Sequence, residues 1–139
     1  MEPRLGIYIH IPFCASKCGY CDFYSCAGAA DRMADYQHAL LEHIEESAVR
    51  IAPAYIDTVY FGGGTPSYLG AERLCRILET VFAHYRVDKN AEITTEANPD
   101  SAREVSALRQ LREAGFNRIS LGMQSASDDE LRLIGRGHT

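Results

Sequence analysis

The sequence predicts an α/β fold with about four parallel βα units, and three observations support this prediction. Short apolar segments that suit strands alternate along the chain with longer segments of helical periodicity. The expected strands are apolar almost throughout, which is typical of parallel strands covered on both faces. Glycine-rich or polar residues directly follow each strand, and ligands bind at this end of the strands in such folds. We therefore expect a parallel sheet with helical crossovers.

The expected strands and helices follow one another in strict alternation. Pro12 ends the first strand, because proline has no N–H to donate to a neighbouring strand. Gly115 is expected to end the third helix. Ser101 and Ser127, each followed three residues later by a glutamate, form capping-box patterns that predict helix starts. The predicted strands are 5–11, 56–61, 91–95 and 117–121, and the predicted helices are 31–51, 71–85, 101–114 and 127–134.

The 139 residues suffice for one ordinary domain. A closed barrel of eight parallel strands needs about 250 residues, and four strands leave two parallel edges without a partner. We expect residues 1–139 to form the N-terminal part of a larger barrel enzyme. The C-terminal half of the barrel would then lie beyond Thr139.

Composition and charge exclude several classes of function. The net charge is −5 and the pI is near 5.5, whereas nucleic-acid binding needs a basic face. No run of apolar residues is long enough to span a bilayer. The N-terminus runs straight into the first strand without the pattern of a signal peptide. We therefore expect a cytoplasmic protein that does not bind nucleic acid and does not span a membrane.

Three of the five cysteines, Cys14, Cys18 and Cys21, are crowded into eight residues after the first strand. In a reducing compartment such a group indicates metal binding rather than disulfides. Three thiolates would hold an iron–sulfur cube and leave one iron open for a ligand. The alternative is a zinc-stabilised binding module, although zinc sites usually have a second cysteine pair. Cys26 is read as a spare thiol or a fourth ligand, and Cys75 as a small core residue in a helix.

The spacing Cys14-x3-Cys18-x2-Cys21, with the aromatic Tyr20 before the last cysteine, resembles the radical S-adenosylmethionine (SAM) superfamily. The resemblance implies a 4Fe–4S cluster whose open iron chelates the amino and carboxylate groups of SAM, and one-electron cleavage of SAM. It also implies the fold, a partial radical SAM barrel of β/α units. The cofactor would carry the difficult chemistry, and the protein would supply binding and orientation.

Further motifs extend the resemblance beyond the cysteines. The segment 62–66, Gly-Gly-Gly-Thr-Pro, resembles the family segment that contacts the amino end of SAM. The segment 95–100 resembles E-x-[DN]-P, whose glutamate binds the sugar. His10 receives no role, because a structural histidine is the simpler interpretation. The SAM contacts implied by the resemblance are Tyr8, Tyr20, Gly63, Gly64, Thr65, Glu96, Gln124 and Arg136. All of these except the two tyrosines are expected on one edge around a shared cavity beside the cysteines.

The segments 10–14, 62–67, 96–99 and 115–124 together resemble one branch of the superfamily. It contains the oxygen-independent coproporphyrinogen III oxidases and the HemW-type haem chaperones. The oxidases carry a further cysteine two positions after the third, where this chain has Phe23. They also have an N-terminal extension that is absent here. Both departures favour a haem chaperone over a porphyrin-modifying enzyme.

The resemblance implies partners as well as cofactors. A haem chaperone would bind haem through a segment beyond Thr139 and pass it to acceptor proteins, with an electron donor serving the cluster. Three alternatives remain open: a coproporphyrinogen oxidase, a haem-degrading relative, and the zinc-stabilised module.

Overall fold

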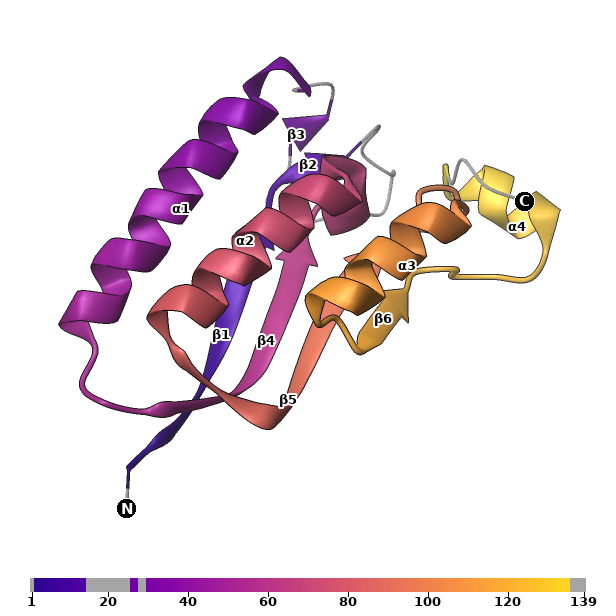
Figure 1. Ribbon diagram of the computed structural model, residues 1–139. Helices are drawn as coiled ribbons and strands as arrows, with labels where there is room; N and C mark the ends of the chain where they lie inside the picture. The colour runs from indigo at the N-terminus through magenta and orange to yellow at the C-terminus, as the bar shows by residue number, and fades with distance from the viewer. Residues whose placement is uncertain (1, 15–25, 28–29, 136–139) are drawn as a thin grey trace.

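The computed structural model describes residues 2–14, 26–27 and 30–135. Four parallel strands form one sheet in the order β1-β4-β5-β6 (Figure 1). This arrangement confirms the predicted α/β fold of four parallel strands. The strand bounds are Arg4–Ile11 for β1, Tyr55–Gly63 for β4, Arg86–Ala97 for β5 and Arg118–Leu121 for β6.

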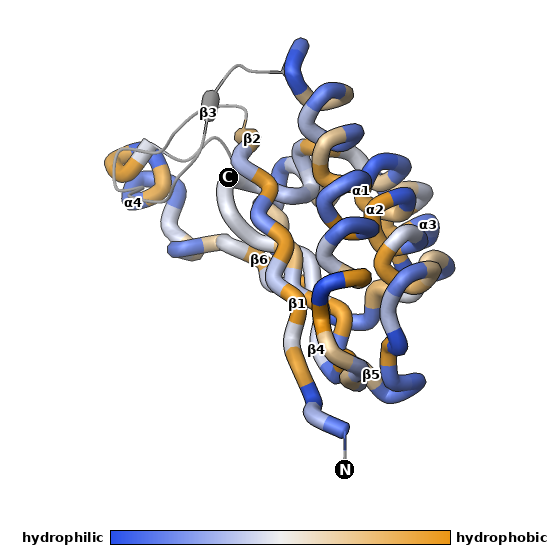
Figure 2. Tube along the Cα trace, turned by 90° about the vertical axis from the view of Figure 1, so that its left-hand side faces the viewer, coloured by the Kyte–Doolittle hydropathy of each residue, from blue (hydrophilic) through white to orange (hydrophobic). Residues whose placement is uncertain are grey.

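Three helices cover one face of this sheet, as Figures 1 and 2 show from two directions. They are α1 (Met33–Arg50), α2 (Ala71–His84) and α3 (Val105–Ala114). Because side chains alternate across a strand, every second residue faces these helices. Ile9 and Ile11 on β1, with Val59 and Phe61 on β4, are buried there and form the core with the apolar side of α2. The opposite face carries Tyr8, Tyr60 and Glu96 and lies away from the three helices.

Two helix starts show where the capping-box pattern holds and where it fails. Helix α4 (Asp128–Leu133) begins as predicted, with Ser127 as the N-cap accepting from the Glu130 N–H. Helix α3 begins at Val105 rather than at residue 101, and its N-cap Glu104 makes no side-chain cap. The Ser101 hydroxyl instead donates to the Asn98 carbonyl at 3.0 Å and closes a turn after β5. A local pattern predicted the helix, and the competing turn displaced its start.

The other observed helix and strand boundaries differ less from the predicted ones. β5 begins five residues before the predicted strand, because Arg86 pairs with Tyr55 in the sheet and its guanidinium lies 4.4 Å from that tyrosine's ring centre. Gly115 has φ of +123° and ends α3, while the next N–H, of Phe116, donates back to Leu111. Short elements that the periodicity did not predict are η1 (Ala30–Arg32), η2 (Pro66–Leu69), β2 (Phe13–Cys14) and β3 (Cys26–Ala27).

Candidate functional site

The glycine segment and the start of the cysteine loop meet at the carboxyl ends of the strands. The Gly64 N–H donates to the Ile11 carbonyl at 2.8 Å, and the Thr65 N–H donates to the Phe13 carbonyl at 2.7 Å. Phe13 directly precedes Cys14, which is only 6% exposed. β2 also pairs with β3 in a short second sheet above this end (Figure 1). The position of Cys14 is therefore tied directly to the segment after β4.

Gly64 is where these two segments approach most tightly. A Cβ atom on Gly64 would lie 2.6 Å from the Phe13 carbonyl oxygen and 3.0 Å from its carbonyl carbon. Both atoms belong to the backbone, so no side-chain rotation could relieve the clash. Glycine at this position is thus required by the close approach, and the sequence argument gave only a general reason for it.

Glu96 reaches the same end of the sheet from β5. Its Oε1 accepts the Gly63 N–H at 3.1 Å, so the carboxylate and the glycine segment are in direct contact. Cys14 and Glu96 therefore lie at the same end of the strands, as predicted. The Asn98 amide, two residues farther along, donates to the Thr65 hydroxyl at 3.1 Å and adds a second link between these segments.

Two tyrosines flank the carboxylate on the face away from the helices. Tyr8 is 58% exposed, and its ring lies parallel to that of Tyr60, with centroids 6.0 Å apart and 16° between the planes. Burial, and then the charge of Glu96, raise the pKa of both phenols above the usual value. The Tyr8 hydroxyl also lies 3.1 Å from His10 Nδ1, within hydrogen-bonding distance. Both tyrosines are therefore neutral at physiological pH.

Gln124 lies on the segment that follows β6, and its side chain is exposed. The Gly122 N–H donates to the Ala97 carbonyl at 2.9 Å, so this segment continues along the end of β5, next to Glu96. Gln124 has φ of +70°, a conformation that residues other than glycine rarely adopt. Five residues of the earlier interpretation lie outside the described residues: Cys18, Tyr20, Cys21, Phe23 and Arg136.

The described residues fit the chemistry of the implied cofactors. Cys14 places a buried sulfur donor beside the glycine segment, and Glu96 places an acceptor carboxylate at the same end of the sheet. No group of three metal-ligating side chains occurs within residues 2–14, 26–27 and 30–135. Two of the three proposed cysteine ligands fall outside these ranges, so the ligand set stays a prediction.

Residues that the sequence interpretation missed are Tyr60, Asn98 and Ser120, all with polar contacts at this site. Strand alternation gives the face of each residue only within its own strand. The pairing of Tyr60 with Thr94, and of Ser120 with Glu96, places both on the same face as Glu96. Asn98 was part of a quoted motif but received no role. Its partner Thr65 lies on a different βα unit, and sequence alone does not reveal that contact.

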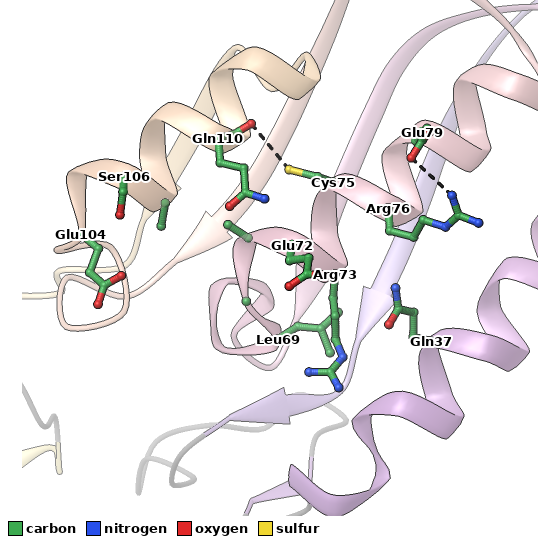
Figure 3. Close-up of a pocket in the computed structure, with 13 residues that line it drawn as sticks. Gln37, Leu69, Glu72, Arg73, Cys75, Arg76, Glu79, Glu104, Ser106 and Gln110 are labelled. Carbon is green, nitrogen blue, oxygen red and sulfur yellow. Dashed lines mark hydrogen bonds and ion pairs between the residues drawn. The ribbon is translucent and has the colours of Figure 1, made fainter.

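Cys75 is not part of this site and lines a groove of about 830 Å³ between α2 and the start of α3 (Figure 3). It is half-buried in α2 and packs against the core, and its thiol donates to the Gln110 carbonyl at 3.6 Å. Burial raises the pKa of this thiol, which favours the protonated form. These contacts agree with a packing role for Cys75.

Comparisons with known proteins give one family model and several similar proteins. The Radical SAM superfamily model matches residues 8–139. The Heme chaperone HemW of Mycobacterium tuberculosis (strain ATCC 25618 / H37Rv) is 42% identical over 137 residues, covering 96% of this chain and 35% of that protein. The Heme chaperone HemW of Escherichia coli (strain K12) is 39% identical over 137 residues, with coverages of 98% and 36%.

A more distant relative and a solved structure extend these similarities. The mitochondrial radical S-adenosyl methionine domain-containing protein 1 of Bos taurus is 35% identical over 136 residues, covering 98% of this chain and 30% of that protein. The structure of coproporphyrinogen III oxidase (HemN) from Escherichia coli, a radical SAM enzyme, matches with a TM-score of 0.90 and 30% identity, covering 99% of this chain and 32% of that one. The chain thus spans about a third of the length of these relatives. Among the helices that the structure describes, none could cross a bilayer.

Proposed function

Because this chain belongs to the radical SAM superfamily, which implies SAM and a 4Fe–4S cluster, we propose that it is the N-terminal part of the radical SAM core of a haem chaperone. The observation that carries this proposal is the set of contacts joining the segment before Cys14, the glycine segment and Glu96 at one end of the sheet. The relatives named Heme chaperone HemW support the assignment of haem as cargo.

Each group of residues has a separate task in this proposal. Cys14, Cys18 and Cys21 hold the cluster through their thiolates, and Cys26 is not a ligand. Glu96 accepts hydrogen bonds from sugar hydroxyls, and the backbone of the glycine segment approaches the amino end of SAM. When bound, the cluster and SAM would supply one-electron chemistry. The residues proposed to contact SAM are Tyr8, Tyr20, Gly63, Gly64, Thr65, Glu96, Gln124 and Arg136.

A second candidate function is oxidation of coproporphyrinogen III. The structural match to the oxidase from Escherichia coli favours it. Phe23 opposes it, because it stands where the resemblance places a further cysteine of the oxidases. The first proposal also includes haem as cargo, acceptor proteins and an electron donor as partners, and a cytoplasmic location.

The proposal is tested by anaerobic reconstitution, with iron and sulfide, of the longer protein of which we propose that residues 1–139 are the N-terminal part. We expect a brown protein with about four irons per chain, the content of one 4Fe–4S cluster, that binds SAM and haem without converting coproporphyrinogen when a reductant is supplied. Turnover of coproporphyrinogen would favour the second candidate. A colourless protein that retains zinc instead would contradict both and favour the zinc-stabilised module.

Cysteine variants supply the matched controls for this experiment. Replacing Cys14, Cys18 or Cys21 by alanine should abolish iron retention, because each would supply one of three thiolates. Cys26→Ala and Cys75→Ala should retain iron at the parent level. Loss of the cluster in Cys26→Ala as complete as in Cys14→Ala would show that the ligand assignment is wrong.

A further inference from the structure

Gly62 has no side chain and so leaves space on the face of the sheet away from the helices. β-Sheet pairing places Tyr8 beside Tyr60, His10 beside Gly62, and Glu96 beside Ser120. Tyr60 and Gly62 are two residues apart on β4, so they point to the same face. Side chains from the neighbouring strands can therefore enter the space above Gly62.

The Glu96 carboxylate occupies that space. A Cβ atom on Gly62 would lie 2.6 Å from Glu96 Oε1, 2.9 Å from the Tyr60 ring and 3.0 Å from the Tyr8 ring. The carboxylate is thus held over β4, beside both rings, with Oε1 accepting the Gly63 N–H. This position depends on groups from strands other than β5, to which Glu96 belongs.

Tyr60 lies beside this carboxylate, because its ring and Glu96 Oε1 lie 2.9 and 2.6 Å from the Cβ position of Gly62. Burial, the charge of Glu96 and a hydrogen bond to that carboxylate raise the pKa of the Tyr60 phenol, whereas a hydrogen bond to Ser120 lowers it. An ionised carboxylate only accepts, so the phenol gives its single proton to Glu96 and accepts from Ser120. The parallel contact with the Tyr8 ring limits rotation of the Tyr60 ring. Ser120, Tyr60, Glu96 and the Gly63 N–H form a connected set across β4, β5 and β6.

We propose that Tyr60 is a positioning residue for the SAM site, which holds the Glu96 carboxylate against the Gly63 N–H in the orientation that receives the sugar of SAM. This inference rests on the proposed function, because it takes Glu96 as a SAM contact. Tyr60 itself acts through Glu96 and need not touch SAM. Hydrogen bonds to charged groups are among the stronger ones in proteins, so loss of this bond should be measurable.

The test compares Tyr60→Phe with the parent in the reconstituted holoprotein, using calorimetric titration with SAM. Tyr60→Phe keeps the ring against Tyr8 and removes only the hydroxyl. We expect about a tenfold weaker affinity for SAM, the effect of losing one charge-assisted hydrogen bond. Tyr55→Phe is the matched control, because it removes a hydrogen-bonded phenol at the other end of the same strand. Its affinity for SAM should equal that of the parent.

A double-mutant cycle separates positioning from a general structural effect. In the Glu96→Gln background, Tyr60→Phe should weaken SAM binding by less than twofold, because the ionised acceptor is already gone. Equal effects of Tyr60→Phe in both backgrounds would overturn the inference. The inference would also be overturned if Tyr60→Phe bound SAM with the affinity of the parent while Glu96→Gln bound it poorly. In that case the proposed function would still stand.

A crystal structure of the Tyr60→Phe holoprotein gives a second measurement that needs no SAM. We expect the Glu96 carboxylate to leave the Gly63 N–H, which it contacts at 3.1 Å in the parent. A carboxylate that stays in place would overturn the inference. If the parent protein binds no SAM at all, the proposed function fails, and the structure alone decides whether Tyr60 positions Glu96.

Discussion

At the scale of single residues, Gly64 connects the segment expected to hold the cluster with the segment expected to hold SAM. Gly64→Ala would drive a Cβ atom against the Phe13 backbone. We expect a loss of about 1–3 kcal/mol in the free energy of unfolding, as for other overpacked sites. We also expect reduced iron retention, because Phe13 precedes Cys14. Urea unfolding and iron analysis of the reconstituted protein measure the two effects.

Gly70→Ala is the control for this prediction. Gly70 has φ of +97°, so alanine is strained there, but no atom lies within 4 Å of the added Cβ. This variant should lose stability through backbone strain, at a cost of about 1–3 kcal/mol, and retain iron fully. Equal iron loss in both variants would show that general destabilisation, rather than the contact with Phe13, controls cluster retention.

At the scale of elements, Asn117 anchors the last strand to its neighbour. Its Oδ1 accepts the Ile93 N–H at 2.8 Å and its Nδ2 donates to the Ala91 carbonyl at 2.9 Å. The side chain thus extends the ladder between β5 and β6 by one position. Asn117→Ala should lower the free energy of unfolding by about 1–3 kcal/mol, because two β5 backbone groups lose their partner. Thermal or urea unfolding measures this loss.

The matched variant is Asn90→Ala, at an exposed position on the same β5 strand. A surface substitution of this kind should change stability by less than about 0.5 kcal/mol. If Asn117→Ala is equally mild, water replaces the lost hydrogen bonds and Asn117 does not anchor β6. Because β6 has only four residues, this anchor also bears on the position of the segment that carries Gln124.

At the scale of the whole molecule, the sheet that the structure describes has two edge strands, β1 and β6. Helices α1, α2 and α3 cover one of its faces (Figure 2). Leu121 and Met123, at the β6 edge and just after it, are about half exposed. Unpaired edges with apolar side chains favour association between chains. We expect residues 1–139 expressed alone to elute above the monomer mass and to unfold without one sharp transition. Size-exclusion chromatography and thermal unfolding measure both properties.

A charged edge provides the test variant for this prediction. Leu121→Lys should shift elution of residues 1–139 toward the monomer, because lysine on an edge strand opposes strand pairing between chains. A parent chain that is monomeric, with a single cooperative transition, would show that four βα units suffice for a stable domain.

The sequence by itself determined the class of fold, since apolar strands alternating with amphipathic helices allow few arrangements other than a parallel sheet. It also determined that Cys14, the glycine segment and Glu96 would lie at one end, because each was predicted at or just after the carboxyl end of a parallel strand. The start of α3 was predicted wrongly at residue 101, since the Ser101 hydroxyl has a nearer partner in Asn98. Only the tertiary structure placed Tyr60, Asn98 and Ser120 at the site, because their partners lie on neighbouring strands or loops distant in sequence. The need for glycine at position 64 was likewise decided by the atoms that lie opposite, which belong to the Phe13 backbone.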